Sequence, residues 1–353
     1  MSLAPDIEKE ESPLAAATGG GFRHNARKAA TFFLKYVVGV SLIAWMVASG
    51  KLELASLTTL PRTLVAECLG LIAVQTVLAA LRVRYILRQQ GIETGLVQCV
   101  MYNCSGVLYS AFLPGGISGD AVRAYLFMKA VPGQRLGILG AMVLDRLLGL
   151  VTMVALGLVA ALYLALTLAF IRPYLLAFTA IFAALTGGLA LLHFIGGRHR
   201  PGERAASGLR SLWAKLHGAI AELRIHHYSA GTIASVMAQS FLIHLTTVGV
   251  IYLCSLHAGA ALGFLEVFTV TPIGLLVNAV PLSPGGLGIG ENAFELLYRA
   301  IQGRQGATSF LISRIFLYAP ALVGLAYIAQ RLVFRRRRGA PAATDSTTKR
   351  DNS

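Results

Sequence analysis

The fold of this chain is decided by two short stretches, which read FLPGGISGD at residues 112–120 and PLSPGGLGIGE at residues 281–291. Each contains Pro-Gly-Gly, then a spacer, then a glycine followed by a carboxylate, Asp120 or Glu291. A break in a helix inside a membrane is costly, because each freed backbone group must find a new partner. The same break in each half of the chain therefore indicates one device used twice, the discontinuous helix with which transporters build a site near the bilayer midplane.

The composition is that of a polytopic helical membrane protein. Of the 353 residues, 56% are hydrophobic and 13% are charged, whereas a soluble domain carries about 25% charged residues. In such a protein a net charge of +15 reports membrane topology, so no nucleic-acid partner is expected. The four cysteines and the histidines show no ligand spacing, so no metal and no cofactor are expected.

The lengths of the apolar segments separate spanning helices from shorter ones. The segments next to the breaks have about 12–17 residues and fall short of a hydrocarbon core of about 30 Å. We therefore predict an all-α integral membrane protein with about six spanning helices and two re-entrant helical hairpins. The apolar segments are 32–49, 62–87, 97–113, 118–130, 136–168, 173–196, 228–256, 263–280, 290–301 and 306–334.

The distribution of lysine and arginine tests this topology. With a cytoplasmic N-terminus and two re-entrant hairpins, 23 of the 31 basic residues are cytoplasmic, Arg82 among them, and three lie within membrane segments. The five on the outside are Lys51, Arg62, Arg172, Arg299 and Arg304. This asymmetry follows the positive-inside rule and predicts an inner (plasma) membrane protein with both termini in the cytoplasm.

The same topology predicts an inverted repeat. Residues 62–168 are expected to form a span, a hairpin entering from the cytoplasm and a span, and residues 228–334 repeat this order from the outside. Transporters place their substrate where such repeats meet. The transmembrane domain is expected at 31–335, between a disordered tail at 1–30 and a basic tail at 336–353. Residues 198–227 have the pattern of an amphipathic helix on the cytoplasmic surface, or of a solvated connector.

Ionisable residues within membrane segments are expensive and mark candidate sites. Arginine makes bidentate hydrogen bonds to phosphate, and the start of a half-helix favours an anion. Three acids and three arginines balance in charge, which would allow them to be buried together. They are interpreted either as a headgroup-binding site or as a structural link between the two halves. The candidate substrate-binding residues are Pro114, Gly115, Gly116, Gly119, Asp120, Arg123, Asp145, Arg146, Pro284, Gly285, Gly286, Gly288, Glu291 and Arg314.

These motifs resemble a known family. The pattern LPGGxxGDxxR from Leu113 to Arg123, the Asp145-Arg146 pair, SPGGLGxGE from Ser283 to Glu291 and the late Arg314 are similar to the lysylphosphatidylglycerol synthase transmembrane-domain family, also called flippase-like or UPF0104. The resemblance covers about residues 30–335. It implies a domain that moves a lipid between leaflets, here without the soluble aminoacyl transferase domain that follows it in the best-known members.

The sequence predicts a lipid flippase or transporter for an amphiphile with an anionic or phosphate-bearing headgroup, with membrane lipids as partners. A small-anion channel or antiporter is the first alternative, because opposed half-helix starts also bind inorganic anions. A non-catalytic membrane subunit of a lipid or cell-envelope pathway, as a homo-oligomer or with a biosynthetic partner, is another. An intramembrane enzyme using Asp120 or Asp145 as base is disfavoured, because no nucleophile or metal set accompanies them.

Overall fold

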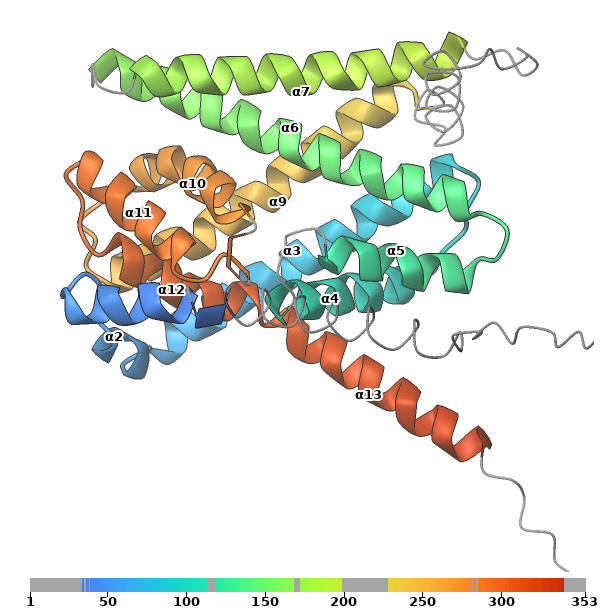
Figure 1. Cartoon of the computed structure of the whole chain (residues 1–353), viewed down its shortest axis with the longest axis horizontal. Helices are drawn as coiled ribbons and strands as arrows, with labels where there is room; N and C mark the ends of the chain where they lie inside the picture. The colour runs from blue at the N-terminus through green and yellow to red at the C-terminus, as the bar shows by residue number, and fades with distance from the viewer. Residues whose placement is uncertain are drawn as a thin grey trace, which may run out of the picture.

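The computed structural model describes residues 34–112 (except 35 and 38), 118–167, 172–198, 228–280, 282–283 and 285–339. Within these ranges every regular element is a helix and no strand occurs (Figure 1). The predicted all-α class is therefore confirmed for the described residues. The predicted N-terminal tail and residues 199–227 of the predicted linker lie outside them, as does the C-terminal tail beyond Gly339.

The helices of the first half match the predicted segments closely. A helical stretch at Gly39–Ala48 and the short α2 (Ala55–Thr58) precede α3 (Arg62–Gln89), α4 (Leu96–Phe112), α5 (Ser118–Ala130) and α6 (Arg135–Thr167). α7 (Arg172–Arg198) then packs along α6. Pro61 stands at the N-cap of α3, where its fixed φ suits the entry into a helix.

The second half contains α9 (Ala230–His257), α10 (Phe264–Asn278), α11 (Ile289–Ala300), α12 (Gly306–Leu317) and α13 (Pro320–Gly339). Ser229 caps the start of α9 by accepting a hydrogen bond from the Thr232 amide over 3.1 Å. The segment predicted at 306–334 contains a candidate span, Gly306–Arg331, but a turn that was not predicted divides it into α12 and α13. Pro320 lacks the amide proton that would continue the helix and disfavours helical backbone before it, so the chain turns at Tyr318 and Ala319.

Four helical segments are long and apolar enough to cross a membrane: Arg62–Gln89, Arg135–Tyr163, Ala230–His257 and Gly306–Arg331. They coincide with four of the predicted spans. The other two predicted spans overlap shorter apolar helical stretches, Gly39–Ala48 and Thr179–Leu191. The described residues thus contain four helices long and apolar enough to span a membrane, and the total of six spans stays a prediction.

α4 and α5 form an antiparallel pair around the first break. Gly119 of α5 lies against Gly106 and Ser110 of α4, and a Cβ atom at Gly119 would collide with the Gly106 carbonyl oxygen. One turn further along α5, Arg123 reaches back to Asn103 of α4. Residue numbers thus rise along one helix as they fall along the other. The turn itself, residues 113–117, lies outside the described residues.

α10 and α11 form the corresponding pair around the second break. A Cβ atom at Gly274 would collide with the Phe294 ring, and one at Gly290 with the Asn278 side chain. The connecting turn requires glycine, because Gly285, Gly286 and Gly288 have φ values of 57°, 73° and 79°. Pro281 and Pro284 lie outside the described residues, so the structure shows what the glycines of this break do but not the prolines.

The two helix pairs lie at opposite ends of the molecule. The start of α3 packs against the end of α9, where Cys68 and Cys254 share a core cluster, and the end of α3 packs against Tyr228 and Val236 at the start of α9. α3 and α9 are therefore antiparallel. Since α4 follows the end of α3 and α10 follows the end of α9, the pair α4 and α5 lies at one end and α10 and α11 at the other (Figure 1).

The packing contacts come in matched pairs. α4 packs against α13 and α10 against α6, while α3 packs against α4 and α9 against α10. Other contacts follow the same exchange, since α3 contacts α6 as α9 contacts α12 and α5 contacts α6 as α11 contacts α12. Each contact among α3, α4, α5 and α6 thus has a counterpart among the corresponding helices of the second half, whereas the contact of α6 with α7 has none.

Candidate functional site

A buried carboxylate joins two arginines in the first half. Asp145 of α6 is 2% exposed, and its Oδ1 accepts a hydrogen bond from Nε of Arg82 on α3 over 2.7 Å. Its Oδ2 accepts from Nη2 of Arg123 on α5, also over 2.7 Å. A carboxylate removed from water is tolerated only when it is paired and hydrogen-bonded, and both oxygens of Asp145 meet that condition. Asp145 therefore ties α3, α5 and α6 together.

The network continues beyond Asp145 in two directions. On one side Nη1 of Arg82 donates to Ser240 of α9 over 2.8 Å, which links the first half to the second. On the other side Arg123 lies 3.5 Å from Asp120, and Asp120 lies 3.1 Å from Nε of Arg146. Among the described residues the network thus contains three arginines and two aspartates, whose charges sum to +1.

Exposure rises along this network from one end to the other. The side chains of Arg82 and Arg123 are both 11% exposed, whereas Asp120 is 24% exposed and Arg146 is 60% exposed. Because Asp145 balances one of the buried arginines and Asp120 lies between Arg123 and Arg146, the excess positive charge is most accessible at Arg146. An external anion would therefore meet the network at this residue, next to the start of α5.

Two buried donors near the same place have no acceptor in the described part of the chain. They are Nδ2 of Asn103 and Nε of Arg123. Oδ1 of the same Asn103 accepts a hydrogen bond from Nη1 of Arg123 over 3.3 Å, so the two side chains are in direct contact. Buried polar groups nearly always have partners, which makes this contact between α4 and α5 a second place able to receive an oxygen atom.

The second break is held by one arginine. Nε of Arg314 on α12 donates to Oε1 of the fully buried Glu291 over 2.7 Å. Its Nη1 donates to the Gly285 carbonyl, and its Nη2 lies 3.1 Å from Oδ1 of Asn278 and 3.3 Å from the Gly286 carbonyl. Oε2 of Glu291 accepts from the Gly288 amide over 2.7 Å and so caps α11. Arg314 is thus engaged by protein acceptors on every nitrogen.

The structure places the predicted residues in two groups. Asp120, Arg123, Asp145 and Arg146 lie together beside α5, and Glu291, Arg314 and the described glycines of the second turn lie together beside α11. Gly119 lies at the contact between α4 and α5. Pro114, Gly115, Gly116 and Pro284 lie outside the described residues.

Sequence reasoning missed Arg82. The charge count assigned it to the cytoplasmic side, but its side chain is buried on Asp145. The expected balance of three acids and three arginines is therefore wrong, because Arg82 is a fourth arginine beside them. The sequence did contain an indication that Arg82 belongs with the intramembrane charges. It lies seven residues before the end of α3, which is about two helical turns inside the helix.

The ion pairs do not join the two halves. All six that the described residues contain lie within 62–168 or within 228–334. The halves meet instead through helix packing and through hydrogen bonds that are not ion pairs, including Arg82 to Ser240 and a ring nitrogen of His244 to the Gly149 carbonyl over 3.0 Å. Within the described residues the ion pairs thus stay inside each half, and the charged network reaches the other half through the hydrogen bond from Arg82 to Ser240.

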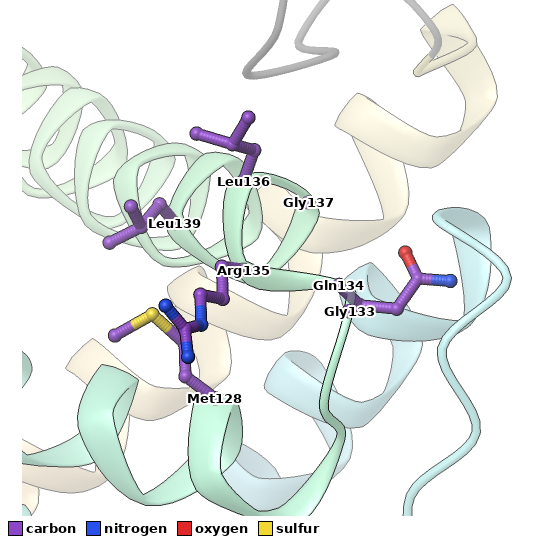
Figure 2. Close-up of a pocket in the computed structure, with 7 residues that line it drawn as sticks. All are labelled: Met128, Gly133, Gln134, Arg135, Leu136, Gly137 and Leu139. Atoms are coloured by element: carbon purple, nitrogen blue, oxygen red, sulfur yellow. The ribbon is translucent and has the colours of Figure 1, made fainter.

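A pocket of about 570 Å³ lies where α5 turns into α6. Figure 2 shows the Arg135 side chain extending from the start of α6 toward Met128 at the end of α5. Leu136 and Leu139 line the same pocket. One guanidinium beside apolar side chains is a lining suited to an amphiphile with an anionic group.

The fold and the site define an all-helical membrane protein with charged networks beside two helix breaks. The family model described as the lysylphosphatidylglycerol synthase TM region matches residues 32–324. The chain therefore belongs to this family, as the motifs predicted, and membership indicates a function related to membrane lipids. The described residues contain no soluble domain. Comparison with curated proteins found no match.

Proposed function

We propose that this protein is a lipid flippase or transporter, which moves an amphiphile with an anionic or phosphate-bearing headgroup between membrane leaflets. In this proposal it moves the lipid without changing it chemically. It lies in the cell inner membrane with both termini in the cytoplasm, and membrane lipids are its partners. The family's relation to membrane lipids supports the lipid substrate.

The observation that carries the proposal is the exposed Arg146 at the end of the charged network that the described residues form beside the first break. The three arginines and two aspartates of this network have charges that sum to +1, and its most exposed member is Arg146. Arginine binds phosphate through a planar fork of donors. An anionic headgroup at Arg146 would neutralise the network while a lipid's acyl chains stay in the bilayer.

The matched packing contacts support an inverted repeat. Exchanging α3 with α9, α4 with α10, α5 with α11 and α6 with α12 and α13 converts the contacts of one half into those of the other. In this reading the two antiparallel pairs are re-entrant hairpins that enter from opposite membrane faces. A site between such repeats becomes accessible from each side in turn when one repeat moves against the other.

The residues near the two breaks take different roles. Arg146 contacts the headgroup, and Asp120 holds its guanidinium in place over 3.1 Å. Asp145 positions Arg123 within the buried part of the network. Arg314 is a positioning residue, because its donors already bind Glu291, Asn278 and the glycine carbonyls of the second turn.

Reconstitution into vesicles tests the proposal. Fluorescent phosphatidylglycerol in proteoliposomes is quenched from outside, and the rate at which inner-leaflet probe becomes accessible is measured. We expect the wild-type protein to accelerate this rate over empty vesicles and Arg146→Gln to lower it by about tenfold, the effect of about 1.4 kcal/mol. Arg88→Gln, at an exposed arginine near the end of α3, is the matched control and should transport normally. Wild-type vesicles no faster than empty ones would refute the proposal, as would full activity of Arg146→Gln.

The small-anion alternative meets a specific obstacle at the second break. The amide of Gly288 at the start of α11 already donates to the buried Glu291 carboxylate, so an inorganic anion there would compete with a fixed negative charge. Measuring chloride flux in the same vesicles without fluorescent lipid separates the two functions. Flux that depends on Arg146 in the absence of lipid movement would favour the channel.

A further inference from the structure

A second group of cations surrounds a pocket that the proposed transport site does not include. The pocket has a volume of about 260 Å³ and lies where the end of α11 meets the turn into α12. Lys51, Arg299 and Arg304 line it together with Glu295 and Gln305. These residues come from two parts of the chain about 250 positions apart, so only folding brings the three positive side chains together.

Positive charge exceeds negative charge in this lining. Glu295 is almost fully buried, and it uses Oε1 to hold Nε of Arg299 over 2.7 Å and Oε2 to accept the Ala307 amide over 3.1 Å. Lys51 and Arg304 form no ion pair with a carboxylate of any described residue. The pocket lining therefore carries three cations against one acid whose oxygens are both already engaged.

The lysine is held in position by an aromatic ring. Nζ of Lys51 lies 4.0 Å from the centre of the Trp45 ring, which is a cation–π contact. Such a contact orients the ammonium group without removing its charge. Nearby Glu53 accepts a hydrogen bond at Oε2 from the side-chain Nε2 of Gln305 over 3.4 Å and does not line the pocket.

The loop that carries Arg304 is fixed before any ligand arrives. Gln302 and Gln305 both have left-handed backbone, with φ values of 63° and 58°, which residues other than glycine adopt only at a cost. The amide of Gly303 donates to the Tyr298 carbonyl over 2.8 Å, and that of Arg304 donates to the Ala260 carbonyl over 3.2 Å. A Cβ atom at Gly303 would collide with the Leu262 side chain. These contacts hold the backbone of the loop, including that of Arg304, in one conformation, while the Arg304 side chain is exposed at the pocket.

We propose that this pocket binds a phosphate-type anion. Its volume is below the range of about 300–1,000 Å³ typical of pockets for whole small molecules, so it suits a single phosphate group. Two unneutralised cations and the terminal amino groups of Arg299 supply the charge-assisted donors that phosphate prefers. The pocket lies at the end of the molecule opposite the α5–α6 turn, where the charge count predicts the outer membrane face. The phosphate can belong to a lipid headgroup or be free in solution.

Two binding measurements on the full-length purified protein test the proposal and identify the source of the phosphate. Calorimetry with inorganic phosphate in neutral detergent measures the free anion. Native mass spectrometry with phosphatidylglycerol measures the lipid. The test variant is the double substitution Lys51→Gln/Arg304→Gln, and the control is Arg62→Gln, which removes a basic residue of the same predicted face that does not line the pocket.

We expect wild-type protein and Arg62→Gln to bind alike, and the double variant to lose affinity at least tenfold for phosphate, for the lipid or for both. Loss for the lipid alone assigns the pocket to a headgroup, and loss for phosphate alone assigns it to a free anion. Equal binding by all three proteins, or equal weakening by Arg62→Gln, overturns the proposal, since binding would then be absent or a general effect of charge. An unfolded double variant is recognised by its melting curve, and the single variant Arg304→Gln then replaces it. This variant should lose at least threefold in affinity while Arg304→Lys, which keeps the charge, loses less, and unchanged binding by Arg304→Gln would overturn the proposal.

The proposal for the pocket and the proposal for the transport site can be refuted independently of each other. Vesicles that show no lipid movement would refute the flippase and leave the anion measurements unchanged, because these use no transport readout. Conversely, if the double variant binds phosphate and lipid as well as wild type does, the proposal for the pocket is refuted. The transport measurement with Arg146→Gln is not affected by that result.

Discussion

Arg82 on α3 and Asp145 on α6 are joined by a 2.7 Å hydrogen bond from Nε to Oδ1, and both side chains are almost fully enclosed. The pair lies 63 positions apart in sequence and connects through Ser240 to the second half of the chain. It is the point from which the first charged network extends to the exposed Arg146. The integrity of the proposed site therefore depends on a residue that an external ligand would not touch.

Asp145→Asn should destabilise the fold strongly. The substitution leaves Arg82 and Arg123 facing each other without their shared counter-charge, and breaking a buried pair in this way costs about 3–5 kcal/mol. Thermal unfolding of the detergent-purified protein measures the effect. Asp120→Asn is the comparison, because Asp120 is 24% exposed and its loss should cost about 1 kcal/mol or less. Similar melting curves for the two variants would show that Asp145 is not the centre of the network.

Arg314→Lys should destabilise the protein although it keeps the positive charge. A lysine ammonium is a single point and cannot bind Glu291, Asn278 and the Gly285 carbonyl from the separate nitrogens that Arg314 uses. We expect a loss of about 2 kcal/mol or more in the free energy of unfolding, as for a charged hydrogen-bond network left incomplete.

The control for Arg314→Lys is Arg299→Lys. Arg299 is 58% exposed and pairs with Glu295 four residues earlier on the same helix, so lysine can replace it at a cost of about 0.5 kcal/mol or less. Stability measured in the same detergent should fall only for position 314. An unperturbed Arg314→Lys variant would mean that charge alone holds the second turn.

Gly119→Ala should open the first helix pair. The added methyl group would collide with the Gly106 carbonyl oxygen and the Ser110 side chain, so α5 must move away from α4. Overpacking of this kind costs about 1–3 kcal/mol. Gly187→Ala in α7 has open space around the new methyl and should stabilise the helix by about 0.5–1 kcal/mol. The melting temperature should therefore fall for Gly119→Ala and rise for Gly187→Ala. A rise for both variants would contradict the close packing at Gly119.

Gly324→Ala tests the contact between the two halves. Gly324 of α13 packs so closely on α4 that a Cβ atom would collide with the Cys104 carbonyl group. The substitution should lower the free energy of unfolding by about 1–3 kcal/mol. Gly70→Ala in α3, with nothing near the added methyl, should be neutral or stabilising. Equal melting temperatures for Gly324→Ala and wild type would argue against this packing of α13 on α4.

Local sequence determined most of the helical order. The segment predicted at 118–130 is α5, and those predicted at 62–87 and 263–280 differ from α3 and α10 by no more than two residues at either end. Hydrophobic length and glycine–proline breaks are properties of neighbouring residues, so they are readable before folding. The turn between α12 and α13 was not predicted, because the hydrophobic residues continue on both sides of it. Pro320 indicated it, since the residue before a proline disfavours helical backbone.

The sequence by itself determined that this is a helical membrane protein of the lysylphosphatidylglycerol synthase transmembrane family with charges beside two breaks. Only the tertiary structure decided which charges meet. It joined Arg82 to Asp145, left Arg146 exposed, enclosed Arg314 among protein acceptors, and gathered Lys51 and Arg304 around one pocket. The physical reason is that an ion pair depends on distances between side chains from different helices, and these distances follow from packing contacts that no local pattern of residues encodes.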